Sequence, residues 1–253
     1  MSVTPAQVKE LRQRTNAGLM ACKSALEESN GDMDGAIELL RKRGESKAAE
    51  KSDRSTGEGR IAISGRAIIK LLCETDFVAK NEDFVAFTQE LADKASSEGV
   101  DAAKAHFESV KGDKIQAIGE NLVLETVEVL EGGDTVNGYV HSNGKVAALV
   151  ALSGGTDDQA KDTAMHATAM APLVANPSDV PADAIEKEVA IYKEQLAEEG
   201  KPEQIWEKIL EGKVKKFCAE RALTSQSFVK DPGMTVQEYL GDATVVSFVR
   251  VLV

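Results

Sequence analysis

The side chains best suited to catalysis or metal binding are the histidines, and their spacing argues against both uses. His106, His141 and His166 lie far apart in the sequence, whereas the histidines of a metal site usually recur at short spacing. The sequence contains neither a GxxxxGK[ST] phosphate loop nor a GxSxG nucleophile motif. We therefore interpret each histidine as a surface residue or as a core residue with satisfied hydrogen bonds. The sequence predicts a binding protein rather than an enzyme, with no metal and no cofactor.

A short stretch after an apolar run carries a different combination of side chains. The run AIIKLLC, residues 67–73, has the character of a buried strand, and Thr75, Asp76, Phe77 and Val78 follow it closely. Thr75 or Asp76 can cap a new helix by accepting a hydrogen bond from an unpaired N–H group of its first turn. A large apolar side chain in that turn must either pack under the sheet or remain available to another molecule. The residues alone leave both alternatives open for Phe77.

Composition limits the partners of the chain. Its 253 residues include 30 Lys and Arg and 42 Asp and Glu, a net charge of −12, which argues against nucleic-acid binding through clustered cations. The first 60 residues are distinct, with 11 basic and 10 acidic residues. Their run Arg41-Lys42-Arg43 either faces an acidic surface of a partner or complements a helix dipole. Without a membrane-length apolar segment or a leader, we expect a cytoplasmic protein with no membrane contact.

Residues 1–44 are predicted to form an amino-terminal module of three short helices, similar to the ubiquitin-associated type of bundle. Thr4 begins a capping box with proline at the first helical position. A second helix is expected over about 19–29, and a third, capped by Asp32, is expected to end near Gly44. The inward-facing side chains are predicted to be Val8, Leu11, Met20, Ala25, Leu26, Met33, Ile37 and Leu40.

The remainder of the chain contains an internal repetition. A linker is expected over residues 45–59, which are rich in Lys, Glu, Ser and Gly. GRIAISGRAIIKLLC at 59–73 and GYVHSNGKVAALVAL at 138–152 then share their glycine spacing, and each predicts a β-hairpin with a buried second strand. Helical stretches follow each hairpin. A third strand is expected to close each half, at 121–131 and at 243–253.

These elements predict an α+β fold with two related core subdomains. The N-subdomain, residues 60–135, and the C-subdomain, residues 136–253, would each hold a small antiparallel sheet and helices. The C-subdomain carries an inserted helical hairpin over about 183–220, because two helical patterns there are separated by Gly200-Lys201-Pro202. Cys22, Cys73 and Cys218 form no CxxC pair, which favours reduced thiols that are mostly buried.

Two motifs, taken in order, resemble the elongation factor Ts family. They are VKELRQRTNAGLMACKSAL in the first module and TDFVAKN after the first hairpin, and the resemblance extends through the second hairpin to GKVKKF. It implies a cytoplasmic translation factor without bond chemistry or cofactor. Such a protein binds elongation factor Tu, in its GDP-bound and nucleotide-free forms, and accelerates GDP release by disturbing the magnesium and nucleotide site.

The same resemblance implies a set of contact residues for elongation factor Tu. Those implied in dislocating the magnesium ion are Thr75, Asp76, Phe77 and Val78, and those implied elsewhere on the contact surface are Lys9, Arg12 and His141. Lys9 and Arg12 would dock the first module, and His141 would act from the turn of the second hairpin. The alternative is a non-catalytic scaffold, in which a ubiquitin-associated-type module is joined to a structural α+β domain. A pull-down separates the two, because a translation GTPase should dominate only in the first case.

Overall fold

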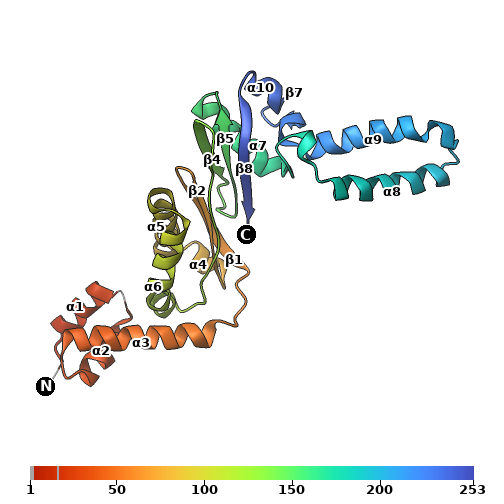
Figure 1. Ribbon diagram of the computed structural model, residues 1–253. Helices are drawn as coiled ribbons and strands as arrows, with labels where there is room; N and C mark the ends of the chain where they lie inside the picture. The colour runs from red at the N-terminus through yellow and green to blue at the C-terminus, as the bar shows by residue number, and fades with distance from the viewer. Residues whose placement is uncertain (1–2, 16) are drawn as a thin grey trace. The chain divides into compact units, whose positions relative to one another are not determined.

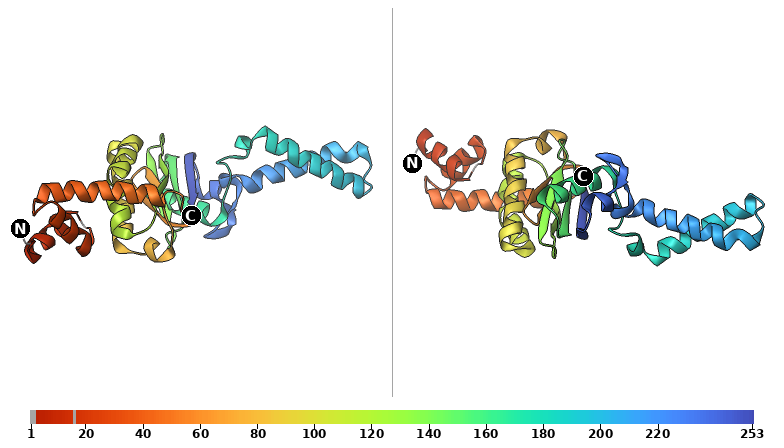
Figure 2. Two further views of the ribbon diagram at one scale, coloured as in Figure 1. Left: turned by 90° about the horizontal axis from the view of Figure 1, so that it is seen from below. Right: turned by 90° about the horizontal axis from the view of Figure 1, so that it is seen from above.

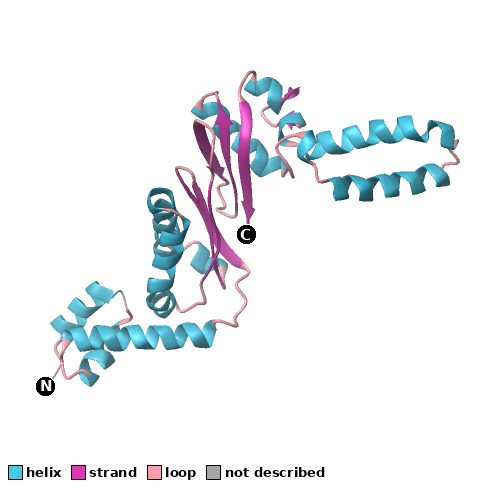
Figure 3. Cartoon of the chain, viewed as in Figure 1, coloured by secondary structure: helices cyan, strands magenta, loops and turns pink. Residues whose placement is uncertain are grey.

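A computed structural model describes residues 3–15 and 17–253 of the chain. It divides into two compact units, Met1–Val129 with Leu252–Val253, and Leu130–Val251. Helices and short strands are both prominent in it (Figure 3). Each unit has a small sheet with helices packed against it, which confirms the predicted α+β class.

The first unit begins with the predicted bundle, formed by α1 (Pro5–Thr15), α2 (Leu19–Glu28) and the first part of α3 (Met33–Lys51). Thr4 and Gln7 make the capping box, since the backbone N–H of each donates to the side chain of the other, at 3.0 and 3.3 Å. The buried side chains are Val8, Leu11, Ala17, Cys22, Ala25, Leu26, Ala36 and Leu40.

Two expectations for this region are wrong. Met20 is 72% exposed, because Cys22, Ala25 and Leu26 form the buried face of α2 and Met20 lies on the opposite side. Helix α3 does not end near Gly44 but continues to Lys51, so the first part of the expected linker, residues 45–51, is helical. Its second half packs along α6 and contributes Ala48 to the edge of a core, which stabilises a helix in a segment without large apolar residues.

The sheet of the first unit has the order β1-β2-β3, formed by Glu58–Ser64, Ala67–Cys73 and Val123–Val129. Both pairings are antiparallel, and Gly65 takes a positive φ of 50° in the tight turn of the hairpin. Helix α5 (Glu82–Glu98) packs on this sheet, and α6 (Val100–Ile118) packs beside α5 (Figure 1). The core between them is built from β2 and from the large side chains Phe84, Phe87, Leu91 and Phe107.

The second unit repeats this plan with the order β4-β5-β8, formed by Thr135–Val140, Val146–Ser153 and Thr244–Leu252. The central strand β5 is buried from Ala147 to Leu152, and α7 (Asp157–Met170) covers it. A small pair, β6 (Ser227–Phe228) and β7 (Asp231–Thr235), and α10 (Val236–Leu240) complete the unit. Both predicted hairpins and both predicted closing strands are therefore confirmed.

The predicted helical hairpin is also present, as α8 (Ala182–Glu198) and α9 (Trp206–Arg221). The two helices run side by side away from the sheet of their unit (Figure 1 and Figure 2). At the base, Val174 and Ala222 form an isolated parallel bridge, and the N–H of Leu223 donates to the carbonyl of Val174 at 2.9 Å. The chain therefore enters and leaves the hairpin at adjacent points.

A candidate partner-binding site around Phe77

Phe77 lies in the one-turn helix α4 (Asp76–Ala79), and its side chain is 82% exposed. The apolar residues that follow it fill the inward positions of the turn, because Ala79 is buried and Val78 packs partly against the core of the first unit. Phe77 is not among the described residues that form that core. Of the two alternatives that the sequence left open, the structure places the aromatic ring on the surface.

Thr75, not Asp76, caps this turn. Thr75 has the extended backbone of an N-cap residue, and its hydroxyl accepts from the N–H of Val78 at 3.5 Å. Asp76 lies one position inside the helix, where a negative charge suits the N-terminal end of the dipole. Its carboxylate binds the Lys80 ammonium at 2.7 Å, and this hydrogen bond raises the pKa of Lys80. The turn thus presents an aromatic ring beside an exposed ion pair.

The backbone before Phe77 is fixed by a carboxylate from a distant part of the chain. Glu120, between α6 and β3, accepts hydrogen bonds from the backbone N–H groups of Glu74 and Thr75 at 2.9 and 3.0 Å. It also accepts from the Thr75 hydroxyl at 2.6 Å. In return, Glu74 accepts from the N–H of Asn121 at 2.7 Å. Nothing in the local sequence around Thr75 indicates these partners, because they are more than 40 positions away.

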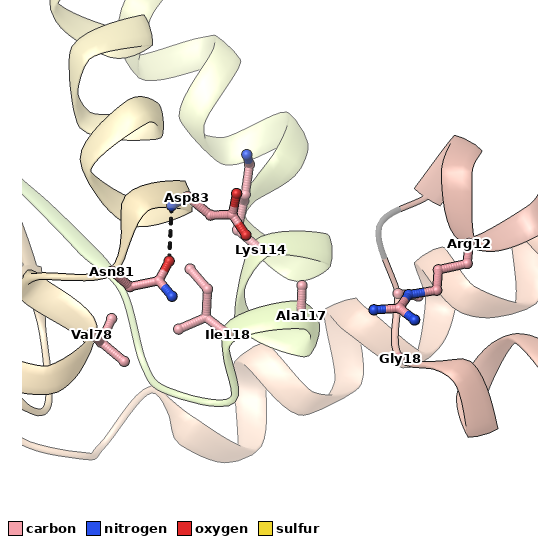
Figure 4. Close-up of a pocket in the computed structure, with 9 residues that line it drawn as sticks. Arg12, Gly18, Val78, Asn81, Asp83, Lys114, Ala117 and Ile118 are labelled. Atoms are coloured by element: carbon pink, nitrogen blue, oxygen red, sulfur yellow. Dashed lines mark hydrogen bonds between the residues drawn. The ribbon is translucent and has the colours of Figure 1, made fainter. Parts of the chain in front are cut away.

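A cavity of about 280 Å³ opens beside the turn, within the first unit (Figure 4). Its polar side chains come from separate elements, and Figure 4 shows the Arg12 side chain extending from the bundle toward the side of the cavity formed by Ala117. At the start of α5, Asn81 accepts from the N–H of Asp83 at 2.9 Å. The lining residues are Arg12, Ala17, Gly18, Val78, Asn81, Asp83, Lys114, Ala117 and Ile118. The structure therefore brings Arg12 and Val78 of the predicted set to one cavity.

A second exposed surface lies on the bundle and was missed by the sequence reasoning. Leu19 is 54% exposed and Met20 is 72% exposed, unusual values for side chains of this size. Together with Val3, Pro5, Val8 and Lys23 they line a shallow groove of about 320 Å³. Lys9 is exposed on the neighbouring helix α1, as expected. The helical period could have indicated this surface, because it places Met20 on the side of α2 opposite to Cys22 and Leu26.

His141 lies in the second unit, at the turn between β4 and β5, as predicted. Its side chain is exposed, its N–H donates to the carbonyl of Val146 at 2.9 Å, and its carbonyl accepts from Gly144 at 2.8 Å. His166 is a satisfied core histidine, bonded to the Gln226 amide oxygen at 3.0 Å and to the N–H of Val229 at 3.1 Å. Burial lowers the pKa of His166, although the bond to Gln226 opposes this effect.

No group of three or more His, Cys, Asp or Glu side chains within residues 3–15 and 17–253 is placed to hold a metal ion. No helix within those residues combines the length and apolar character that crossing a bilayer requires. Cys22, Cys73 and Cys218 are buried thiols, as predicted.

The fold and site define an α+β protein that presents an aromatic side chain on a braced surface turn. Residues 74–253 match a family model described as elongation factor TS. The chain is 43% identical over 265 residues to a protein of Idiomarina loihiensis named elongation factor Ts, covering 99% of this chain and 90% of that relative. It is 45% identical over 256 residues to one of Deinococcus deserti with the same name, covering 96% and 97%. The chain belongs to the elongation factor Ts family and is a translation elongation factor of protein biosynthesis.

Proposed function

We propose that the protein binds elongation factor Tu, in its GDP-bound and nucleotide-free forms, and accelerates the release of GDP without making or breaking covalent bonds. The observation that carries the proposal is the 82% exposure of Phe77 on a turn whose backbone is held from both sides. Exposure of an apolar side chain to water is unfavourable, so burial of Phe77 against another protein surface would release free energy for binding. The proposed site of action is the cytoplasm, with neither a nucleic acid nor a membrane as partner.

In the proposed mechanism, the factor acts on the metal rather than on the nucleotide. A bound nucleoside diphosphate is held by backbone amides of a phosphate loop and by a magnesium ion that neutralises its oxygens. Phe77 enters an apolar pocket of the partner, and the elements that hold the magnesium ion shift to admit it. Loss of the metal contact removes a large part of the GDP affinity. By linkage, the factor binds nucleotide-free partner more tightly by the same free energy.

The other residues of the site have supporting roles in this proposal. Thr75 caps the turn, Val78 anchors it to the core, and Asp76 sets the charge beside the ring. Lys9 and Arg12 add charged contacts from the bundle, which also carries the exposed apolar groove that Leu19 and Met20 line. As the resemblance to the family implies, the pocket for Phe77 and the surface for the bundle would both lie on the GTPase domain of the partner. His141 provides a contact from the second unit.

The test is the release of labelled GDP from elongation factor Tu, measured with and without the protein. Excess unlabelled GDP prevents rebinding, so the observed rate is that of release. We expect the rate to rise with the concentration of the protein and then to saturate. A rate that stays at its intrinsic value would contradict the proposal. A pull-down from which translation GTPases are absent would favour the scaffold alternative.

A further inference from the structure

We propose that Glu120 is a positioning residue for Phe77, and that the three-residue segment Gly119–Asn121 fastens the Phe77 turn to the chain that follows α3. This inference rests on the proposed function, because it concerns how Phe77 is held ready for the partner. It involves a carboxylate that lies 43 positions after Phe77 and that makes no contact with the aromatic ring in the described interactions.

The first half of the argument is the set of bonds that Glu120 makes. Its two carboxylate oxygens accept three hydrogen bonds, two from backbone N–H groups and one from the Thr75 hydroxyl. The Thr75 hydroxyl in turn accepts from the N–H of Val78. Glu120 therefore fixes the backbone before Phe77 directly, and the backbone after it through one hydroxyl. Phe77 lies between the two fixed points.

The second half of the argument is what holds Glu120 and its neighbours. The side-chain amide of Asn121, which is 2% exposed, donates to the carbonyls of Arg54 at 3.1 Å and Ser52 at 3.4 Å. Lys51, the last residue of α3, donates to the carbonyl of Gly119. The Arg54 guanidinium lies 3.5 Å from the Glu74 carboxylate. The same short segment thus joins the end of α3 to the start of the Phe77 turn.

This arrangement matters because an exposed side chain has no core to hold it in place. The direction of Phe77 is set by the backbone of residues 74–79 and by little else. If that backbone were free to move, only a fraction of molecules would present the ring correctly, and its effect on the partner would fall in proportion. A carboxylate is suited to the task because it is purely an acceptor and forms strong hydrogen bonds to N–H and O–H groups.

The first experiment measures the order of the turn without any partner. Backbone amide hydrogen exchange of residues 75–79 is compared for the wild type, Glu120→Gln, Glu120→Ala and the control Glu128→Ala. Glu128 is an exposed carboxylate on β3, so its removal changes the net charge equally. We expect exchange about tenfold faster in Glu120→Ala, an intermediate rate in Glu120→Gln, which keeps one acceptor oxygen, and no change in the control.

The second experiment measures GDP release from elongation factor Tu across a range of factor concentrations. The other surfaces still bind the partner, so Glu120→Ala should lower the maximal rate about tenfold and change the half-saturating concentration less than about threefold. Glu120→Gln should recover part of the rate. In a Phe77→Ala background, the further change to Glu120→Ala should have little effect, because the positioned side chain is already gone.

The outcomes separate this inference from the proposed function. If Phe77→Ala slows release but Glu120→Ala behaves as wild type in both experiments, the positioning role is wrong and the proposed function stands. If the wild type leaves GDP release unchanged, the proposed function fails, and the exchange measurement still decides whether Glu120 orders the turn. If Glu120→Ala does not fold, Thr75→Val replaces it, since valine removes the relaying hydroxyl at nearly the same volume. Unchanged exchange in that variant would overturn the inference.

Discussion

The backbones of Gly44 in α3 and Gly112 in α6 approach so closely that a β-carbon on Gly44 would lie 2.8 Å from the carbonyl carbon and oxygen of Gly112. Ordinary contacts of a β-carbon begin at about 3.4 Å, so only glycine fits. Gly44 is also buried within the continuous helix. The glycine that the sequence reasoning took for a helix end is therefore a point where two helices cross in direct backbone contact.

We predict that Gly44→Ala lowers the free energy of unfolding by about 1 to 3 kcal/mol, as expected for overpacking against rigid backbone. Gly212→Ala in α9 is the matched control, because nothing lies within 4 Å of the position its β-carbon would take. That change should stabilise the protein by up to about 1 kcal/mol through helix propensity. Urea unfolding followed by circular dichroism measures both. Equal effects of the two substitutions would show that the helices do not cross at Gly44.

Phe77→Ala should separate stability from function. Because the ring is exposed, we expect the free energy of unfolding to change by less than about 0.5 kcal/mol. Loss of an aromatic anchor should cost about 2 kcal/mol of coupling to the partner, which is roughly a thirtyfold slower stimulated release of GDP. Phe84→Ala, which empties a fully buried position, should instead cost about 3 to 5 kcal/mol of stability. A Phe77→Ala variant that melts and exchanges like the wild type would refute the insertion mechanism.

Met20→Ser tests the apolar groove on the bundle. The side chain is 72% exposed, so its loss should leave the melting temperature almost unchanged. If Met20 is buried against the partner, the complex with nucleotide-free elongation factor Tu should weaken by about 1 to 2 kcal/mol. Isothermal titration calorimetry measures this change. Leu26→Ala is the contrast, because its side chain is fully buried and its loss should destabilise the fold by about 2 to 5 kcal/mol. Unaltered affinity in Met20→Ser would remove the groove from the contact surface.

His166 should make the second unit less stable in mild acid. Burial lowers its pKa in the folded state below the ordinary value of 6.5, so the unfolded chain takes up a proton first as the pH falls. Stability is therefore complete above about pH 6.5 and declines below it, by up to about 1.4 kcal/mol per pH unit, until the folded pKa is reached.

Urea unfolding at pH 7.5, 6.5, 6.0 and 5.5 measures this decline. His166→Asn should have a smaller pH dependence in this range, even though the variant is destabilised at every pH by the lost hydrogen bonds. A wild-type curve that is flat between pH 7.5 and 5.5 would show that His166 takes up its proton equally well in the folded chain.

The sheets and caps of this fold could be predicted because their signals are local. The runs that became β2 and β5 are apolar except for Lys70 and the terminal Ser153, as is typical of central strands, and the turn at Gly65 needs a positive φ. Thr4 and Gln7, three residues apart, predicted the start of α1, because together they form a capping box. In each case neighbouring residues decide the structure, and no distant segment has to be known.

The two wrong predictions, for Met20 and for the end of α3, concern local sequence patterns that are compatible with more than one structure. Helix α2 is apolar on two sides, and a small bundle buried the small side chains Cys22 and Ala25 while leaving Met20 outside. A glycine near the end of an apolar pattern is typical of a helix end, but it also allows two helices to cross closely. The second structure could be predicted for Gly44 only if its neighbour Gly112 were known. At the candidate site, the residue types at Thr75–Val78 predicted a capped helical turn, and the structure has one. The hydrogen bonds from this turn to Glu120 could not be predicted, because only the folded chain brings Glu120 close to Thr75.

The bridge between Val174 and Ala222 has a consequence for the way insertions are tolerated. A long segment inserted between two elements costs conformational entropy, because its two ends must be held close together. Here the backbone hydrogen bonds at the base, around Val174 and Ala222, hold the ends of the inserted hairpin together. We therefore expect the outer part of the α8–α9 hairpin to be replaceable without reopening the sheet of its unit, as long as the apolar cluster of Val180, Phe217 and Cys218 at the base is kept. A shorter hairpin that keeps the chain up to residue 185 and from residue 214 onward should leave the fold of the second unit intact. The same base offers a point at which a foreign domain can be grafted.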